Sequence, residues 1–320
     1  MLSIPDFKEK QILFIQPERN AENRIKLIND NIAFLKDDKI INQLSCHKIF
    51  AIFIIGDISI TSVLVRNCLK CGISIFLLKN NFETYAVIGS EAEGNYLLRI
   101  KQYNLSDEFN LAKHIVKNKF LNQMILLKSG KKINGKDFEK MNAELNEKID
   151  SARDDKELLG IEGSSTKNFF QTYFAEIDWY KRMPRTKVDH YNVLMDMGYT
   201  FIFNYTDSLL RLYGFDTYKG FYHKLFFQRK SLTCDLVEPF RCIIDKQLLK
   251  SYHLGQIVRE DFEYFGGRYL LKYDKSQKYA NIFLEAILDR KDDLFLFIKD
   301  FYRCVIKEEK GDYPIFKIEP

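Results

Sequence analysis

Several features that define whole classes of protein are scarce or missing in this sequence. The chain has six cysteines among 320 residues, which is too few for a disulfide scaffold. The longest apolar run, residues 49–55, is far shorter than the roughly 20 residues that a bilayer span needs. The first residues show neither the basic start nor the apolar stretch of an export signal. We therefore expect a cytoplasmic protein with reduced thiols and no membrane-spanning helix.

Two of the cysteines, Cys68 and Cys71, have the spacing of a zinc knuckle. No second pair of this kind and no pair of histidines completes a set of four ligands. We interpret the two cysteines as small apolar side chains on a helix face, with a zinc or redox site as the alternative.

Composition and charge are those of an ordinary globular protein. Hydrophobic residues make up 46% and charged residues 29% of the chain, which excludes wholesale disorder. A length of 320 residues is enough for about two domains. The net charge is only +5, from 49 basic and 44 acidic residues, so it hints at a polyanionic partner without demonstrating one.

The first 90 residues have a β-type pattern. Runs rich in Ile, Phe and Val predict strands at 12–15, 48–55, 73–78 and 84–88, with a turn at 80–81. One helix, 61–71, interrupts them and stops at Gly72. A polar stretch flanked by glycines, 89–94, is the best linker candidate. We therefore predict a small β-rich, sandwich-like domain over residues 1–90.

Beyond the linker, apolar residues recur at the three- and four-residue spacing of helices. The clearest helix has Asp189 as its N-cap and Gly214 as its stop. A hairpin at 262–271 can interrupt the pattern. The predicted helices are 95–104, 107–128, 137–149, 156–177, 189–213, 231–252, 277–289 and 292–309. The sequence thus predicts an α+β protein in which a larger all-α domain, residues 91–320, follows the β-rich one.

Glu162 occupies an apolar face of the predicted helix 156–177. It lies four residues after Leu158 and seven before Phe169, and small residues follow it at 163–166. Burying a carboxylate without a partner is costly. The position therefore indicates either a functional carboxylate or a structural one paired with an arginine.

A second acidic feature lies in the helix that begins near residue 231. Asp235 and Glu238 are three residues apart and share a helix face, where like charges repel unless a cation lies between them. Pro239 has no N–H, so it leaves the carbonyl of Asp235 without a helical donor and predicts a kink. A divalent metal can compensate the two carboxylates, or a nearby Arg241 or lysine can neutralise them and make the pair structural.

His223 lies in an aromatic loop just before that helix, and a lone histidine in such a place is usually structural. Considered jointly, Glu162, His223 and Glu238 form a carboxylate–imidazole–carboxylate set. Such a set suits Mg²⁺ or Mn²⁺ and argues against a thiolate zinc site. Incomplete protein ligation leaves room for water and phosphate oxygens, as metal-assisted phosphodiester chemistry requires.

Basic residues cluster in three segments. Seven lysines lie between residues 113 and 136 without any Asp or Glu, a second cluster spans 181–187, and a third follows His223 at 224–230. Such runs are either solvated surface or a binding site for a phosphate backbone.

Several separated motifs resemble the CRISPR-associated spacer-acquisition integrases, the Cas-one family. Residues 48–64 (KIFAIFIIGDISITSVL) and 72–78 (GISIFLL) resemble the signature of that family's β-domain, and 160–163 (GIEG) resembles its first catalytic motif. The remaining matches, in the family's order, are 192–199, 214–215, 220–223, 231–232 and 235–241. The resemblance extends from about residue 10 to 310, so chance agreement is a poor explanation.

The resemblance implies a β-rich domain that dimerises and a helical catalytic domain that binds Mn²⁺ or Mg²⁺. Its metal ligands are Glu162, His223 and Glu238, with Asp235 as a further catalytic residue. It also implies binding of DNA, a homodimer, and a small Cas-two subunit that completes a heterohexameric complex. The residues that we expect to contact DNA are Lys113, Lys117, Arg182, Arg185, Lys224, Arg229 and Arg241.

The activity implied is the joining of 3′-OH ends of short DNA to the leader-proximal repeat of a CRISPR array by transesterification. Two alternatives remain at this stage. One is a metal-dependent endonuclease that cuts branched DNA with water as the nucleophile. The other is a DNA-binding scaffold without catalysis, in which the acidic cluster is structural.

Overall fold

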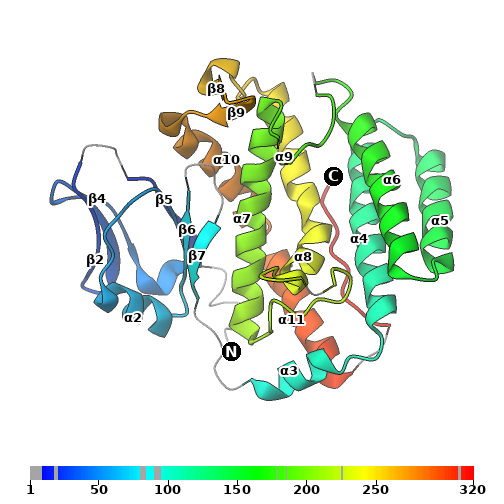
Figure 1. The fold of residues 1–320 in the computed structure, drawn as a ribbon, viewed down its shortest axis with the longest axis horizontal. Coiled ribbons are helices and arrows are strands. Elements are labelled where there is room, and N and C mark those ends of the chain that lie inside the picture. Colours follow the sequence, from blue (N-terminus) through cyan, green and yellow to red (C-terminus); the bar gives the residue numbers. More distant parts are fainter. Residues whose placement is uncertain are drawn as a thin grey trace.

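The computed structural model describes residues 9–17, 21–79, 84–89, 95–177, 179–184, 186–224, 226–308 and 311–320. Strands gather at one end of the molecule and helices at the other, and helix α7 (His190–Tyr213) runs between them (Figure 1). The architecture is α+β, as predicted. Three predictions lie outside the described residues: the turn at 80–81, residues 90–94 of the linker, and the domain boundary at 90/91.

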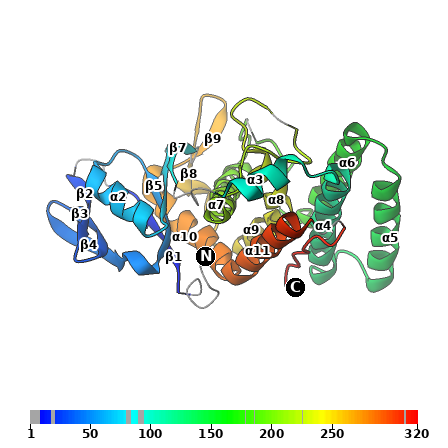
Figure 2. The same cartoon turned by 90° about the horizontal axis from the view of Figure 1, so that it is seen from below.

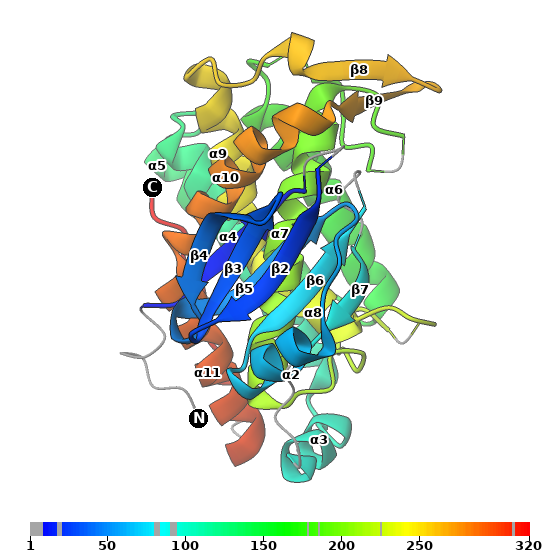
Figure 3. The same ribbon diagram turned by 90° about the vertical axis from the view of Figure 1, so that its left-hand side faces the viewer.

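The N-terminal part consists of two sheets that enclose a small core (Figure 3). The larger has the order β1 (Gln11–Ile15), β5 (Ile49–Ile55), β6 (Ser74–Leu78), β7 (Thr84–Ile88), and only β7 is antiparallel to its neighbour. The smaller is antiparallel, with β2 (Asn23–Ile28), β3 (Asn31–Lys36) and β4 (Lys39–Ser45). Helix α2 (Ser62–Lys70) adds Leu64 and Cys68 to the core between the sheets. Burial raises the pKa of Cys68 to about 12, so its thiol stays protonated and apolar as interpreted.

Strand β5 joins the two halves through one hydrophobic core. All seven of its residues are buried. Ile52 and Ile54 belong to the core between the sheets, whereas the Phe53 ring stacks on Phe201 of α7 with ring centroids 5.6 Å apart. A strand with parallel neighbours on both sides and cover on both faces needs a continuous apolar run. This explains why residues 49–55 form the longest such run in the sequence.

The sequence analysis did not identify β2, β3 and β4. Their connections are two-residue turns, Asn29–Asp30 and Asp37–Asp38, in which all four residues have positive φ between 47° and 60°. Such turns match the twist of a hairpin, but Asn-Asp and Asp-Asp are weaker signals than Asn-Gly. Strand β4 is exposed at its first five positions, so it shows no alternation of apolar and polar residues.

The helical part confirms each predicted helix within a few residues, and 231–252 is divided into two helices. Gly214 ends α7 with a φ of 87°, and Asp189 caps its start, as predicted. The helices are α3 (Tyr96–Tyr103), α4 (Glu108–Ser129), α5 (Gly135–Ser151), α6 (Asp155–Tyr173), α7, α8 (Ser231–Val237), α9 (Arg241–His253), α10 (Ser276–Leu288) and α11 (Lys291–Lys307).

Helices α4, α5 and α6 lie side by side at the end of the molecule opposite the sheets (Figure 2). The all-α prediction needs one correction, because β8 (Phe262–Phe265) and β9 (Arg268–Leu271) form the hairpin anticipated at 262–271. Within the described ranges, no helix combines the length and apolar character needed to cross a bilayer.

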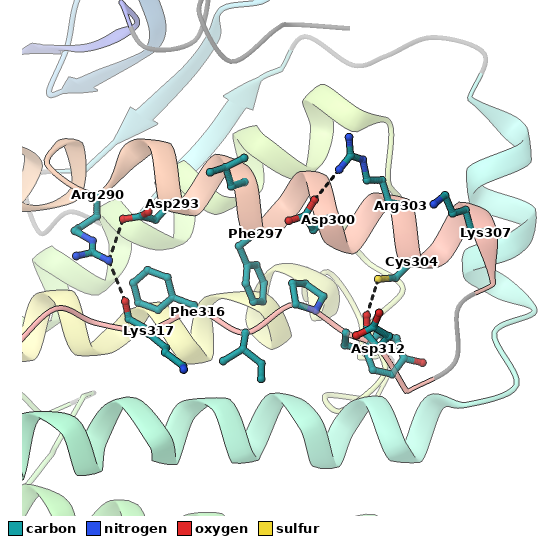
Figure 4. Close-up of a pocket in the computed structure, with 14 residues that line it drawn as sticks. Arg290, Asp293, Phe297, Asp300, Arg303, Cys304, Lys307, Asp312, Phe316 and Lys317 are labelled. Carbon is teal, nitrogen blue, oxygen red and sulfur yellow. Dashed lines mark hydrogen bonds and ion pairs between the residues drawn. The ribbon is translucent and has the colours of Figure 1, made fainter.

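The C-terminal residues 311–320 form an extended segment beside α4 and α11 (Figure 4). Asn118 and Asn122, one turn apart on α4, accept the backbone N–H groups of Phe316 and Ile318 at 3.0 and 2.7 Å. Both asparagines also donate to the carbonyl of Phe316. The segment therefore fixes the middle of α4 to the rest of the helical part.

Candidate active site and basic groove

Glu162 lies in the middle of α6 and reaches α4. Asp154 caps the start of helix α6, and its carboxylate accepts two backbone N–H groups of the first turn at 2.9 Å. The Glu162 Oε1 atom contacts the ammonium of Lys119 on α4, and the Tyr222 hydroxyl lies 3.5 Å from Oε2. The half-buried Glu162 thus has a basic partner, which is a lysine rather than the expected arginine.

Pro239 breaks the predicted helix 231–252 where the sequence placed the kink. Helix α8 ends at Val237, residues Glu238–Phe240 form a 3-10 turn, and α9 begins at Arg241. Because of this break, Asp235 and Glu238 do not share one cation. Asp235 pairs with His223, whereas Glu238 pairs with Lys119 and Arg241.

Asp235 is fully buried and holds the loop that carries His223. Its carboxylate accepts the backbone N–H groups of Phe221, Tyr222 and His223 at 2.6, 3.0 and 2.8 Å. The loop can approach this closely because residue 220 is glycine: a Cβ there would lie 2.8 Å from Asp235 Oδ2. Asp235 was expected among the catalytic residues, and the contacts that the structure shows for it are those of a residue that positions the loop and the His223 ring.

The orientation of the His223 ring follows from the same carboxylate. Nδ1 of His223 lies 2.7 Å from Asp235 Oδ1, so Nδ1 donates to Asp235 and Nε2 is left to act as a ligand. The imidazole is near enough to Glu238 that its charged form lowers the pKa of Glu238. Glu162 and Glu238 thus meet at Lys119, and His223 lies within electrostatic range of Glu238; their joint role as metal ligands stays a prediction.

Glu238 is buried between two cations. Its Oε2 lies 2.8 Å from Lys119 Nζ, and its Oε1 lies 3.1 Å from the guanidinium of Arg241. Burial disfavours the charged carboxylate, but Arg241 and Lys119 outweigh burial and lower the pKa of Glu238 to about 2. Burial also opposes the charge on Lys119, yet Glu238 and Glu162 raise its pKa. Glu238 and Lys119 are therefore both charged at neutral pH.

The sequence analysis counted Lys119 only as one of seven lysines in a basic run. Its side chain is 8% exposed, and it lies on the buried face of α4 with Ile115, Val116, Asn122 and Gln123. That position at helical spacing, on an apolar face, was the available signal. The same signal had already singled out Glu162.

Asp245 and Tyr199 line one cavity together with Glu162 and Glu238. The Tyr199 hydroxyl donates to Asp245 Oδ1 at 2.5 Å, and the guanidinium of Arg241 lies 4.8 Å from the centre of the Tyr199 ring. Burial raises the pKa of Asp245 from 3.8 to about 7, although the Tyr199 hydrogen bond and Arg241 oppose the rise.

This raised pKa predicts a pH dependence of stability. Between about pH 4 and pH 7 the folded chain holds a proton on Asp245 that the unfolded chain has lost, so the free energy of unfolding falls as pH rises. The loss is up to about 1.4 kcal/mol per pH unit. Asp245→Asn, which keeps an acceptor for Tyr199, should reduce this slope in urea titrations at several pH values. An unchanged slope would show that Asp245 does not cause it.

Two neighbouring cavities connect the site with a basic surface. A cavity of about 380 Å³ is lined by residues that include Lys119, Glu162 and Glu238. A second cavity, of about 730 Å³, shares Arg182, Tyr199 and Arg241 with the first. Charged residues that line the larger cavity, here called the basic groove, are Arg182, Lys187, Arg229, Lys230, Arg241 and Asp196. Three predicted DNA contacts from separate segments thus meet beside the carboxylates.

The other predicted DNA contacts do not join the basic groove. Lys113 donates to the backbone carbonyl of Asp150 at 2.8 Å, and Lys117 pairs with the Asp150 carboxylate at 2.6 Å. Both lysines attach α4 to α5 rather than line the basic groove. Lys224 is exposed and pairs with Asp155 at 3.1 Å. Arg185 lies outside the described residues.

Comparison with known proteins decides the family. The model of the family described as CRISPR associated protein Cas1 matches residues 19–285. The chain belongs to the Cas1 family. A Cas1 relative from Thermodesulfovibrio yellowstonii, named as a CRISPR-associated endonuclease, is 28% identical over 278 residues, which cover 80% of this chain and 86% of that protein.

Solved structures share the Cas1 fold of this chain at low identity. A casposase bound to an integration product has a TM-score of 0.79 and 18% identity, with 97% of this chain and 96% of that chain covered. A chain of a Cas6-RT-Cas1–Cas2 complex has a TM-score of 0.80 and 22% identity, with 98% of this chain and 36% of that chain covered. These likenesses confirm the order of a β-rich part followed by a helical part.

The site contains oxygen donors that suit a divalent cation, with a lysine between them. Two carboxylates meet at one ammonium, and Glu238 Oε2 is buried without a hydrogen bond despite its ion pair with Lys119. Among the residues that the structure describes, no three Asp, Glu, His or Cys side chains already have metal-ligand geometry. The donor set of two carboxylates and an imidazole suits Mg²⁺ or Mn²⁺, provided that the ammonium moves from between the carboxylates.

Proposed function

We propose that this chain is the integrase subunit that joins 3′-OH ends of short DNA to the leader-proximal repeat of a CRISPR array. The observation that carries the proposal is the meeting of Glu162 and Glu238 at Lys119, in electrostatic range of His223 and next to the basic groove, in a member of the Cas1 family. A Mg²⁺ or Mn²⁺ ion held by these three residues would stabilise the charge that develops on a phosphodiester during reaction.

In the proposed reaction, a DNA 3′-oxygen forms a bond to a phosphorus of the repeat. The bond from that phosphorus to the 3′-oxygen of the target strand breaks, and the proton of the attacking hydroxyl is lost while the departing oxygen gains one. The number of phosphodiester bonds is unchanged, so no ATP is required. Asp235 holds His223 for this role, and Arg182, Arg229 and Arg241 line the groove that receives the backbone.

Two exposed aromatic residues directly precede the segment 228–230 that lines the basic groove. Phe226 and Phe227 lie between Lys224 and Arg229, and they are 73% and 83% exposed. Exposed rings among cations are the usual arrangement for single-stranded nucleic acid, because bases stack on the rings and cations hold the backbone. The proposed ligand of the groove is therefore the single-stranded end of a DNA substrate.

The proposed assembly is a homodimer that binds a small Cas2 subunit to form a heterohexamer in the cytoplasm. The Cas1–Cas2 complex among the structural neighbours supports the pairing with Cas2. Size measurement of the purified chain, with and without a Cas2 protein from the same genome, tests this assembly.

Replacing Arg229 should weaken DNA binding through the loss of one phosphate contact. Arg229→Ala is expected to reduce the slope of log K against log salt by about 1, measured by fluorescence anisotropy with a single-stranded DNA. Lys113→Ala is the matched control, since Lys113 binds the carbonyl of Asp150 and should leave the slope unchanged. Equal slopes for Arg229→Ala and the wild type would exclude Arg229 from the DNA interface.

A strand-transfer assay tests the proposed function. Labelled DNA with a free 3′-OH, a supercoiled target carrying a repeat array, and Mn²⁺ should give a joined product. Shortened DNA without joining would instead support the endonuclease alternative, which the relative's name favours. If neither product forms, the result would support the DNA-binding scaffold without catalysis.

A further inference from the structure

Lys119 occupies the place where the proposed site would hold its metal. Its Nζ contacts Glu162 Oε1 and Glu238 Oε2, and each of these carboxylates is a proposed ligand. The site thus has two carboxylates and two cations, Lys119 and Arg241, before any metal is added. The charges of the carboxylates are balanced by the chain itself.

The position of Lys119 is fixed by its surroundings. Its neighbours on α4, Asn118 and Asn122, both bind the backbone of the C-terminal segment. The Lys119 side chain is 8% exposed, so its ammonium is not available to a DNA backbone in this arrangement. By contrast, Lys117 is 30% exposed and pairs with Asp150 on the other side of α4.

A divalent cation and this ammonium cannot use the same oxygens at once. A metal bonds to carboxylate oxygens at about 2.0–2.2 Å, well inside the distance of an ammonium ion pair. An ammonium left in place would face a doubly charged ion at short range, where repulsion is strong. Binding of the metal therefore requires that Lys119 leave at least one of its two partners.

We propose that Lys119 is a built-in counter-ion of the metal site. It holds Glu162 and Glu238 together when no metal is bound, and it competes with the divalent cation for their oxygens. Lys119 is therefore a positioning residue that sets the metal affinity. This inference rests on the proposed function, because it takes the two carboxylates to be metal ligands.

The test measures Mn²⁺ affinity rather than DNA joining. Lys119→Met removes the charge and keeps an apolar stem of similar length. The full chain with this change should bind Mn²⁺ about tenfold more tightly than the wild type. The affinity is measured by electron paramagnetic resonance, which detects the free Mn²⁺. In EDTA its melting temperature should be lower by about 5 °C, because Glu162 and Glu238 then lose their common cation and only Glu238 keeps a basic partner, Arg241. Mn²⁺ should raise that temperature more than it does for the wild type.

Lys117→Met is the matched control, since it removes a lysine from the same helix and should leave Mn²⁺ affinity unchanged. Lys119→Gln replaces Lys119→Met if the latter does not fold, because an amide still donates hydrogen bonds to the carboxylates but carries no charge. Equal or weaker Mn²⁺ binding by the Lys119 variant, with normal binding by the wild type, would overturn this inference alone. Absence of Mn²⁺ binding in every protein would overturn the proposed metal site and the competition with it.

Discussion

Replacement of Glu162 by glutamine is expected to abolish the joining of DNA ends while the protein stays folded. Glutamine has the same shape and still accepts from Lys119, but it removes the negative charge that a divalent cation needs. We expect the rate of strand transfer to fall at least about a hundredfold, measured with labelled 3′-OH DNA and supercoiled target. The free energy of unfolding should change by about 1 kcal/mol or less.

The control is Glu147→Gln, which makes the same chemical change at an exposed position on α5. It should join DNA at the wild-type rate. If Glu162→Gln retains wild-type joining, Glu162 has no part in the reaction and its pair with Lys119 is purely structural.

Replacement of Asp235 by alanine is expected to damage both stability and activity. Three backbone N–H groups and the Nδ1 of His223 would lose their acceptor in a buried place. Loss of a buried, multiply bonded carboxylate costs about 3–5 kcal/mol, which urea denaturation can measure. Joining should also fall, because the His223 ring is no longer oriented.

Asp150→Ala serves as the control for this prediction. Asp150 is an exposed carboxylate that pairs with Lys117, so its removal should cost less than about 1 kcal/mol. A cost for Asp235→Ala as small as that for Asp150→Ala would show that the loop does not depend on Asp235.

The fold could be read from the sequence where local pattern and burial agree. The helix caps of α7, the kink at Pro239 and the doubly buried strand β5 each have a local cause, so each was predictable. Strands β2 to β4 were not, because β4 is largely exposed and their turns lack glycine. The clamp of the C-terminal segment by Asn118 and Asn122 joins residues almost 200 positions apart and leaves no local pattern.

The candidate site was predictable in its members but not in its connections. Glu162, His223 and Glu238 stand out as polar residues in apolar or aromatic surroundings. Asp235 was singled out by its spacing from Glu238, but its role depends on a loop that only the fold places beside it. Lys119 was hidden among other lysines, because a basic run does not show which member faces the core. Of the predicted DNA contacts, Arg182, Arg229 and Arg241 meet in the basic groove, whereas Lys113 and Lys117 bind α5.

Crystals soaked in Mn²⁺ and measured at the manganese absorption edge test the central claim most directly. The account predicts an anomalous peak bound by Glu162, Glu238 and the Nε2 of His223, with the ammonium of Lys119 moved away from at least one carboxylate. A peak elsewhere in the molecule, or an unchanged Lys119 bridge at saturating Mn²⁺, would contradict it.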